Sequence, residues 1–87
     1  MVVNGVVIKK VIIDPHYEER HGDTISDEII LQLVRTLDGE EHLPDKVSPP
    51  YSYFKKERIR LEDKFYRLVW LLEEDEIFVG VINAYRR

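Results

Sequence analysis

The carboxy-terminal third of the chain, Glu57 to Arg87, contains three apolar runs that short acidic stretches separate. Within the first run, basic and aliphatic residues alternate with a period of two, which places them on opposite faces of a strand: Arg58, Ile59, Arg60 and Leu61. This pattern predicts an antiparallel meander with strands at roughly Ser52–Leu61, Phe65–Leu72 and Glu76–Ala84. The second strand is apolar on both faces apart from Arg67, so we expect it to be the central one.

A strand and two helices are predicted before the meander. The β-branched run Val6–Ile13 is typical of a strand, and Asn4-Gly5 suits a tight turn that folds Val2-Val3 back on it. Asp14-Pro15 is a favourable helix start, with Asp as the cap and Pro in the first turn, and Gly22 is a suitable end.

The second helix begins after a cap at Thr24 or Ser26 and closes at Asp38-Gly39. Its apolar residues form a single stripe at helical spacing: Ile25, Ile29, Ile30, Leu33, Val34 and Leu37. The following segment, Glu40–Pro50, contains three prolines and is expected to be a loop. The resulting order is β-α-α-β-β-β, an α+β domain with two helices packed on one face of a small antiparallel-rich sheet.

Length and composition favour a single domain over residues 1–87, because 87 residues with 44% hydrophobic side chains support one core. The longest apolar runs fall far short of the ~20 residues that a membrane span needs. The amino terminus lacks the pattern of a signal peptide, and no cysteine is present, so we expect a cytoplasmic protein without disulfides. No cofactor is expected.

Charge is distributed unevenly along a chain of net charge −4. Residues 1–50 carry five Lys/Arg against ten Asp/Glu, whereas residues 51–87 carry eight against seven. The acids of the second half lie mostly in the predicted turns, so the strands between them are basic. A basic strand surface on an acidic molecule indicates a local anion site rather than a wide nucleic-acid footprint.

The ordered pattern of the last third resembles the carboxy-terminal half of the RelE/ParE toxin superfamily. The resemblance rests on about thirty residues: Arg58-Ile59-Arg60-Leu61, then Tyr66-Arg67-Leu68-Val69-Trp70, an acidic turn, Ile77-Phe78-Val79-Gly80-Val81-Ile82 and the closing Tyr85-Arg86. It implies a RelE-like fold, a small protein antitoxin as partner and, for RelE-like members, cleavage of messenger RNA, usually on the ribosome. ParE-like members poison DNA gyrase instead.

Carried over position by position, the resemblance implies roles for the basic residues. Arg67 and Arg86 would steady the reacting phosphate, with Tyr85 as a further catalytic candidate. Phosphate binding is expected from the remaining basic side chains of this region: Lys55, Lys56, Arg58 and Arg60. Fixed guanidinium groups suit the task, because negative charge builds on the phosphoryl oxygens when a ribose 2′-hydroxyl attacks.

His16 and Arg20 are spaced four residues apart on the first predicted helix. This His-x-x-x-Arg arrangement is similar to a group of small RelE-related proteins, for which it implies that His16 is a general base and Arg20 a phosphate ligand. A surface pair beside Glu18 and Glu19 is the structural alternative. A metal site is not expected, because the spacing of His16 and His21 is poor for shared ligation on a helix.

Other interpretations stay open at this point. The meander arginines are also compatible with a solvated face on which they pair with nearby acids: Glu62, Asp63 or Glu73. Three aromatic residues suit base stacking, antitoxin docking or core packing: Tyr51, Tyr53 and Phe54. The leading hypothesis is an RNA endonuclease toxin held by an antitoxin, with homodimerisation open. The alternative is a non-catalytic binding protein, either a gyrase poison or a degenerate antitoxin-binding member, and a small housekeeping protein is a third interpretation.

Overall fold

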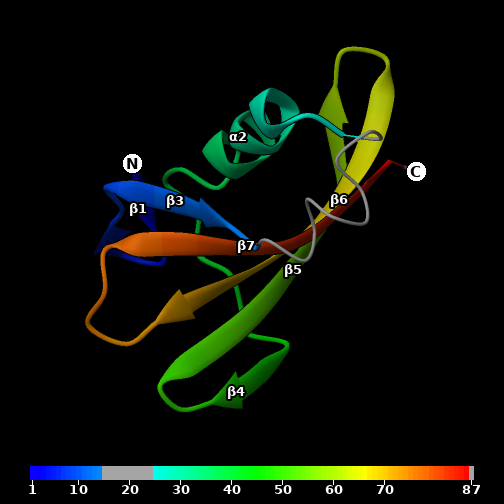
Figure 1. The fold of residues 1–87 in the computed structure, drawn as a ribbon. Coiled ribbons are helices and arrows are strands. Elements are labelled where there is room, and N and C mark those ends of the chain that lie inside the picture. The colour runs from blue at the N-terminus through cyan, green and yellow to red at the C-terminus, as the bar shows by residue number, and fades with distance from the viewer. Residues whose placement is uncertain (15–24, 87) are drawn as a thin grey trace.

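A computed structural model describes residues 1–14 and 25–86 (Figure 1). The elements follow the order β1 (Val2–Val3), β2 (Val6–Val7), β3 (Lys10–Ile13), α2 (Asp27–Arg35), β4 (Lys46–Ser48), β5 (Tyr51–Leu61), β6 (Lys64–Glu73) and β7 (Phe78–Arg86). Five strands form one mixed sheet in the order β3-β7-β6-β5-β4, in which β3 pairs parallel with β7 and the other neighbours are antiparallel. Strands β1 and β2 form a separate hairpin.

One face of the sheet carries the core beneath α2. The helix buries Ile30, Leu33 and Val34 on that face, and α2 lies over the sheet in Figure 1. The sheet contributes fully buried side chains from its central strands, including Leu68, Trp70 and Val79. Phe54 stacks on Trp70, with ring centroids 4.2 Å apart and planes 11° apart. This layer of α2 on the sheet is the main hydrophobic core.

The amino-terminal hairpin is attached to the segment that follows α2. Asn4 and Gly5 both have positive φ, 52° and 76°, as a two-residue type I′ turn requires. The Asn4 side chain donates to the His42 carbonyl (3.0 Å) and accepts from the His42 backbone N–H (2.8 Å). Gly39 N–H donates to the Val2 carbonyl at 2.7 Å. These hydrogen bonds fix the hairpin against residues 39–42.

The predicted fold class was wrong. Strands take up 54% of the described residues and helix 12%, and the described part of the chain contains one helix beside a five-stranded mixed sheet. The fold is therefore mostly β, not an α+β arrangement of two helices on a small sheet. The predicted helix that starts at Asp14-Pro15 falls on residues 15–24 and lies outside the described residues.

Two features of the chain explain the error. The predicted loop Glu40–Pro50 contains β4, because three of the four residues between Pro44 and Pro49 pair at the sheet edge with Tyr51–Tyr53. The predicted strand Val6–Ile13 is split, so that Val6–Val7 joins the hairpin and Lys10–Ile13 joins the sheet. Local pattern shows that a segment is extended, but it does not show which partner the segment pairs with.

Other local predictions are confirmed. Ser26 caps α2, and its Oγ accepts from the Ile29 N–H at 3.3 Å. The meander strands lie within two residues of the predicted bounds, and β6 is the central strand of the five. Within the described ranges, no helix combines the length and the apolar character that a bilayer crossing requires.

We expect Trp70→Ala to lower the free energy of unfolding by about 3–5 kcal/mol, because it removes a fully buried ring and leaves a cavity against Phe54. Trp70→Phe should cost less, since the indole N–H has no hydrogen-bond acceptor among the described residues. Chemical denaturation measures both. Leu43→Ala is the control, with an expected change within about 0.5 kcal/mol because Leu43 is 94% exposed. Equal losses for Trp70→Ala and Leu43→Ala would contradict this core.

Candidate nucleic-acid interface

The sheet has a second face, opposite α2, which we call the open face. Successive residues of a strand point to opposite faces of the sheet, and residues that pair directly on neighbouring strands share a face. Lys56 pairs with buried Leu68 on the α2 side, so the pair Lys55 and Val69 lies on the open face. Among the described elements, α2 and the β1–β2 hairpin contribute to the core side, and no element of the described ranges packs on the open face.

A β-bulge in β5 determines what lies beside Arg67. The register shifts between Lys56 and Ile59, so Glu57 and Arg58 together oppose the single residue Arg67 on β6. Arg58 takes the left-handed conformation, with φ 54°. Arg67 Nε lies 2.9 Å from Glu57 Oε1, an ion pair in which the N–H is not aligned for a hydrogen bond. The bulge thus places a carboxylate directly against the guanidinium.

Tyr85 completes this site from the other neighbouring strand. It pairs with Arg67 in the β6–β7 register, and the Arg67 guanidinium carbon lies 5.8 Å from the Tyr85 ring centroid. This distance is within cation–π range. The Tyr85 hydroxyl accepts a hydrogen bond of 2.6 Å from Asn83 Nδ2. We call Glu57, Arg67, Asn83 and Tyr85 the Arg67 cluster.

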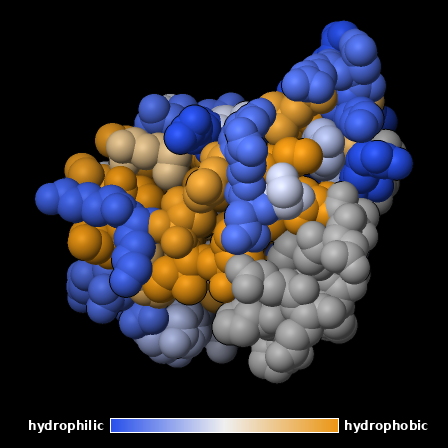
Figure 2. Space-filling view, turned by 45° about the horizontal axis from the view of Figure 1, so that its top comes forward, coloured by the Kyte–Doolittle hydropathy of each residue, from blue (hydrophilic) through white to orange (hydrophobic). Residues whose placement is uncertain are grey.

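Further aromatic and basic side chains lie along the open face, on both sides of the cluster and toward the other end of the strands. Strand register adds Tyr51, Tyr53, Phe65, Phe78, Lys46, Lys55 and Arg60. The Tyr51 and Tyr53 rings are 6.3 Å apart, and Arg60 Nε donates to the Glu62 carbonyl at 3.1 Å. Lys55 Nζ lies 3.5 Å from Asp45 Oδ2. Hydrophilic side chains cover the projecting β5–β6 hairpin, at the upper right of Figure 2.

The open face therefore offers the two properties that single-stranded nucleic acid requires. Flat aromatic rings provide surfaces on which bases stack, and guanidinium and ammonium groups bind backbone phosphates. Arg67 is partly buried: 30% of its side chain is exposed, while its Nε atom is shielded from solvent. Within the described ranges, no group of three or more His, Asp and Glu side chains is arranged to hold a metal ion.

The structure separates the predicted site residues into several places. Arg67 and Tyr85 lie together in the cluster, and Lys55 and Arg60 lie on the same face. Arg58 is exposed in the bulge. Arg86 lies at the exposed end of β7 and pairs with buried Tyr66, so it is on the α2 side of the sheet. His16 and Arg20 lie outside the described residues.

Lys56, like Arg86, lies on the α2 side of the sheet, where its contacts stabilise the fold. Its Nζ lies 2.6 Å from Glu40 Oε1 and donates to the Thr36 carbonyl at 3.2 Å. His42 Nε2 lies 3.3 Å from the same carboxylate oxygen, and the His42 ring meets Trp70 edge-on at 5.4 Å. This group ties β5 to the end of α2. Lys56 is therefore held away from the open face.

Sequence reasoning missed Glu57 and Asn83 as members of the site. Glu57 is the one acid in a run of four charged residues, 55–58, and the bulge brings it beside Arg67. Asn83 interrupts an otherwise apolar strand, a polar residue that could have been singled out.

Comparisons with known proteins give no relative: no family model, no curated protein and no solved structure matches the chain.

The Glu40 group makes a prediction about acid stability. The hydrogen bond from Lys56 lowers the pKa of Glu40 below its ordinary value of 4.5; partial burial opposes this shift, and the charges of Lys56 and His42 add to it. Because the pKa of Glu40 is lower in the folded state than in the unfolded state, its ionised carboxylate stabilises the fold above pH 4.5. This stabilisation is lost as the pH falls through the lower pKa of the folded state.

Glu40→Gln should therefore be less stable than the parent at neutral pH, by less than about 1 kcal/mol because Glu40 is half exposed. The difference should shrink as the pH falls below 4.5. Denaturant unfolding across the acid range measures it, with exposed Glu41→Gln as the control. A difference that is constant with pH would contradict the assigned ion pair.

Proposed function

We propose that the chain is the toxin of a toxin–antitoxin pair and that it cleaves RNA at the Arg67 cluster. The observation that carries the proposal is the convergence of a carboxylate, a guanidinium and a phenol from three neighbouring strands on one accessible sheet face. The resemblance of the meander to RelE-like toxins supports the same activity. The mostly β architecture gives no support of its own, so the proposal depends on the site.

The cluster contains the groups that RNA cleavage by internal attack requires. The Glu57 carboxylate accepts the proton of the ribose 2′-hydroxyl, and the 2′-oxygen forms its bond to the adjacent phosphorus. Arg67 binds the phosphoryl oxygens, on which negative charge builds. The bond to the 5′-oxygen breaks, and this oxygen takes the Tyr85 proton. Asn83 Nδ2, which donates to the Tyr85 oxygen at 2.6 Å, stabilises the phenolate that remains.

The surrounding residues would hold the RNA strand. Tyr51 and Tyr53 offer stacking surfaces along β5, while Arg60 and Lys55 reach the backbone on either side of the cluster. His16 and Arg20 stay predicted contributors. In this proposal the protein acts on RNA in the cytoplasm, and the antitoxin inactivates it by covering the open face.

A specific observation favours the second candidate, a toxin-like protein that binds without cleaving. Arg67 is already paired with Glu57 at 2.9 Å, so the two charges cancel in the free protein. A partner that docks by its own carboxylates would exploit Arg67 without needing a general base. The gyrase poison and the degenerate antitoxin-binding protein both belong to this class.

Expression of the chain alone, followed by mapping of cellular RNA ends, tests the proposal. Arg67→Ala and Glu57→Gln should each reduce cleavage by about 100-fold or more, because each removes a group that acts in the transition state. Arg35→Ala is the matched control, since Arg35 is an exposed arginine in the last turn of α2. Thermal unfolding of each variant shows whether the fold is kept.

Two results would count against this function. Growth arrest with intact RNA would favour the non-catalytic candidate. Equal cleavage by the Arg67→Ala and Arg35→Ala proteins would remove the Arg67 cluster from the mechanism.

A further inference from the structure

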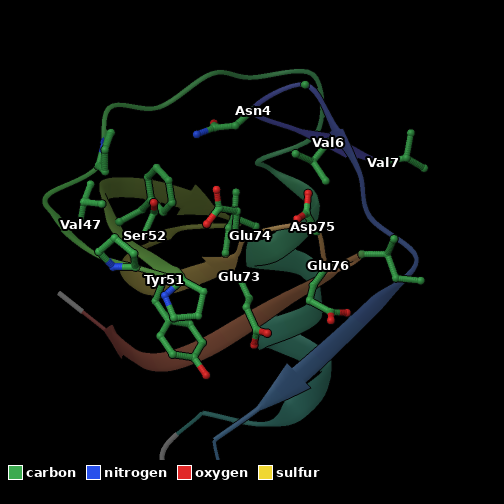
Figure 3. A pocket seen from close by; sticks show the side chains of 17 residues that line it. Asn4, Val6, Val7, Val47, Tyr51, Ser52, Glu73, Glu74, Asp75 and Glu76 are labelled. Atoms are coloured by element: carbon green, nitrogen blue, oxygen red, sulfur yellow. The ribbon is translucent and has the colours of Figure 1, made fainter.

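A hollow of about 770 Å3 opens at the end of the β5–β6 hairpin that lies away from its tip (Figure 3). Three segments that are distant in the sequence form it: the β1–β2 hairpin, the stretch from Pro44 to Ser52, and the turn between β6 and β7. In Figure 3 the acidic residues of the turn lie between Val47 and Tyr51 on one side and Val6 and Val7 on the other. This volume is in the range of sites that hold ligands or peptide side chains.

The walls of the hollow are apolar and open to solvent. Ten large hydrophobic residues of the described ranges are exposed, and four of them line this one hollow: Val6 (38%), Val7 (54%), Val47 (58%) and Ile77 (50%). Pro44, Pro49 and Pro50 extend the same surface. Exposed apolar side chains that gather around a concavity mark a place where another molecule is bound.

The remaining wall is acidic. Glu73, Glu74, Asp75 and Glu76 line the hollow, and the lining residues include no lysine, arginine or histidine. In the part of the chain that the structure describes, none of these four carboxylates forms an ion pair. The hollow therefore combines four negative charges with unburied apolar surface.

Backbone hydrogen bonds hold the acidic turn in place. Glu74 N–H donates to the Pro50 carbonyl at 2.8 Å, which joins the turn to the proline-containing wall. Glu76 N–H donates to the Glu73 carbonyl at 3.1 Å and closes the turn itself. A wall fixed in advance loses little conformational entropy when a ligand binds.

We propose that this hollow binds a segment of another protein in which an apolar side chain is flanked by lysine or arginine residues. The valine and proline walls bury the apolar side chain, while Glu73 to Glu76 pair with the flanking cations. A purely polar cation would leave the apolar walls exposed, and a purely apolar segment would desolvate the carboxylates without compensation. The hollow contains none of the Arg67 cluster residues, although Tyr51 borders both the hollow and the proposed RNA surface. Peptide binding in the hollow therefore does not depend on RNA cleavage.

The test uses the full chain labelled with nitrogen-15 and the peptide acetyl-Lys-Arg-Leu-Val-Arg-Lys-amide. The expected result is a saturable shift of backbone amides that line the hollow. Two comparison peptides, one with serine in place of Leu-Val and one with glutamate in place of the basic residues, should bind about tenfold or more weakly. Equal binding of the serine peptide would overturn the apolar part of the proposal.

Substitutions in the chain test whether the peptide binds in the hollow. Glu74→Lys and Val7→Ser should each weaken the peptide by about tenfold, since they change an acidic and an apolar wall at exposed positions. Asp63→Lys is the matched control; it makes the same charge change at the β5–β6 tip and should leave affinity unchanged. The proposal is overturned if the shifts fall on the Arg67 cluster, if no amide of the hollow shifts at millimolar peptide, or if sedimentation shows that Glu74→Lys abolishes self-association. In that last case the occupant is a second copy.

Discussion

The packing of α2 and the Phe54–Trp70 stack onto a single face of the sheet is the contact on which the rest of the structure depends. It buries the helix stripe against the sheet, and Trp70 retains no exposed surface. Because this one layer supplies the main core, the described elements leave the opposite face free. The residues that alternate with the core residues lie on that opposite face, and they include Arg67 and Tyr85.

The bulge in β5 creates the candidate site on that face. Without the extra residue, strict alternation would continue along β5 and Arg67 would face one side chain instead of a bulged pair. With it, Glu57 lies against the guanidinium, while Lys56 remains on the α2 side and holds Glu40. The bulge thus gives two adjacent residues different roles: Lys56 stabilises the fold, and Glu57 belongs to the Arg67 cluster. Bulges commonly re-aim side chains in this way.

Much of the local structure was predictable from the sequence. Ser26, Asn4-Gly5 and the meander strands have chemical signatures that act over a few residues, and each forms as expected. The fold class was not, because strand pairing depends on distant partners: Lys46–Ser48 pairs at an edge despite flanking prolines, and Val6–Val7 leaves the sheet for the hairpin.

The composition of the candidate site was also only partly predictable from the sequence. The pairing of Arg67 with Tyr85 was within reach, since both were singled out from the meander. The positions of Lys56 and Glu57 were not, because the two-residue period fails at the bulge and alternation alone assigns the wrong neighbours. The acidic turn was expected to be a simple connection. Its place in the wall of a hollow became visible only when the β1–β2 hairpin and the proline segment were located beside it.

The most direct test of the central claim is to map where a non-cleavable single-stranded RNA, with 2′-O-methyl ribose throughout, binds the full chain. Nuclear magnetic resonance titration reports each backbone amide. We expect shifts concentrated on β5, β6 and β7 around Arg67 and Tyr85, with affinity that falls as salt rises. Shifts confined to α2, or an absence of binding at low salt, would contradict the account of the open face as a nucleic-acid interface.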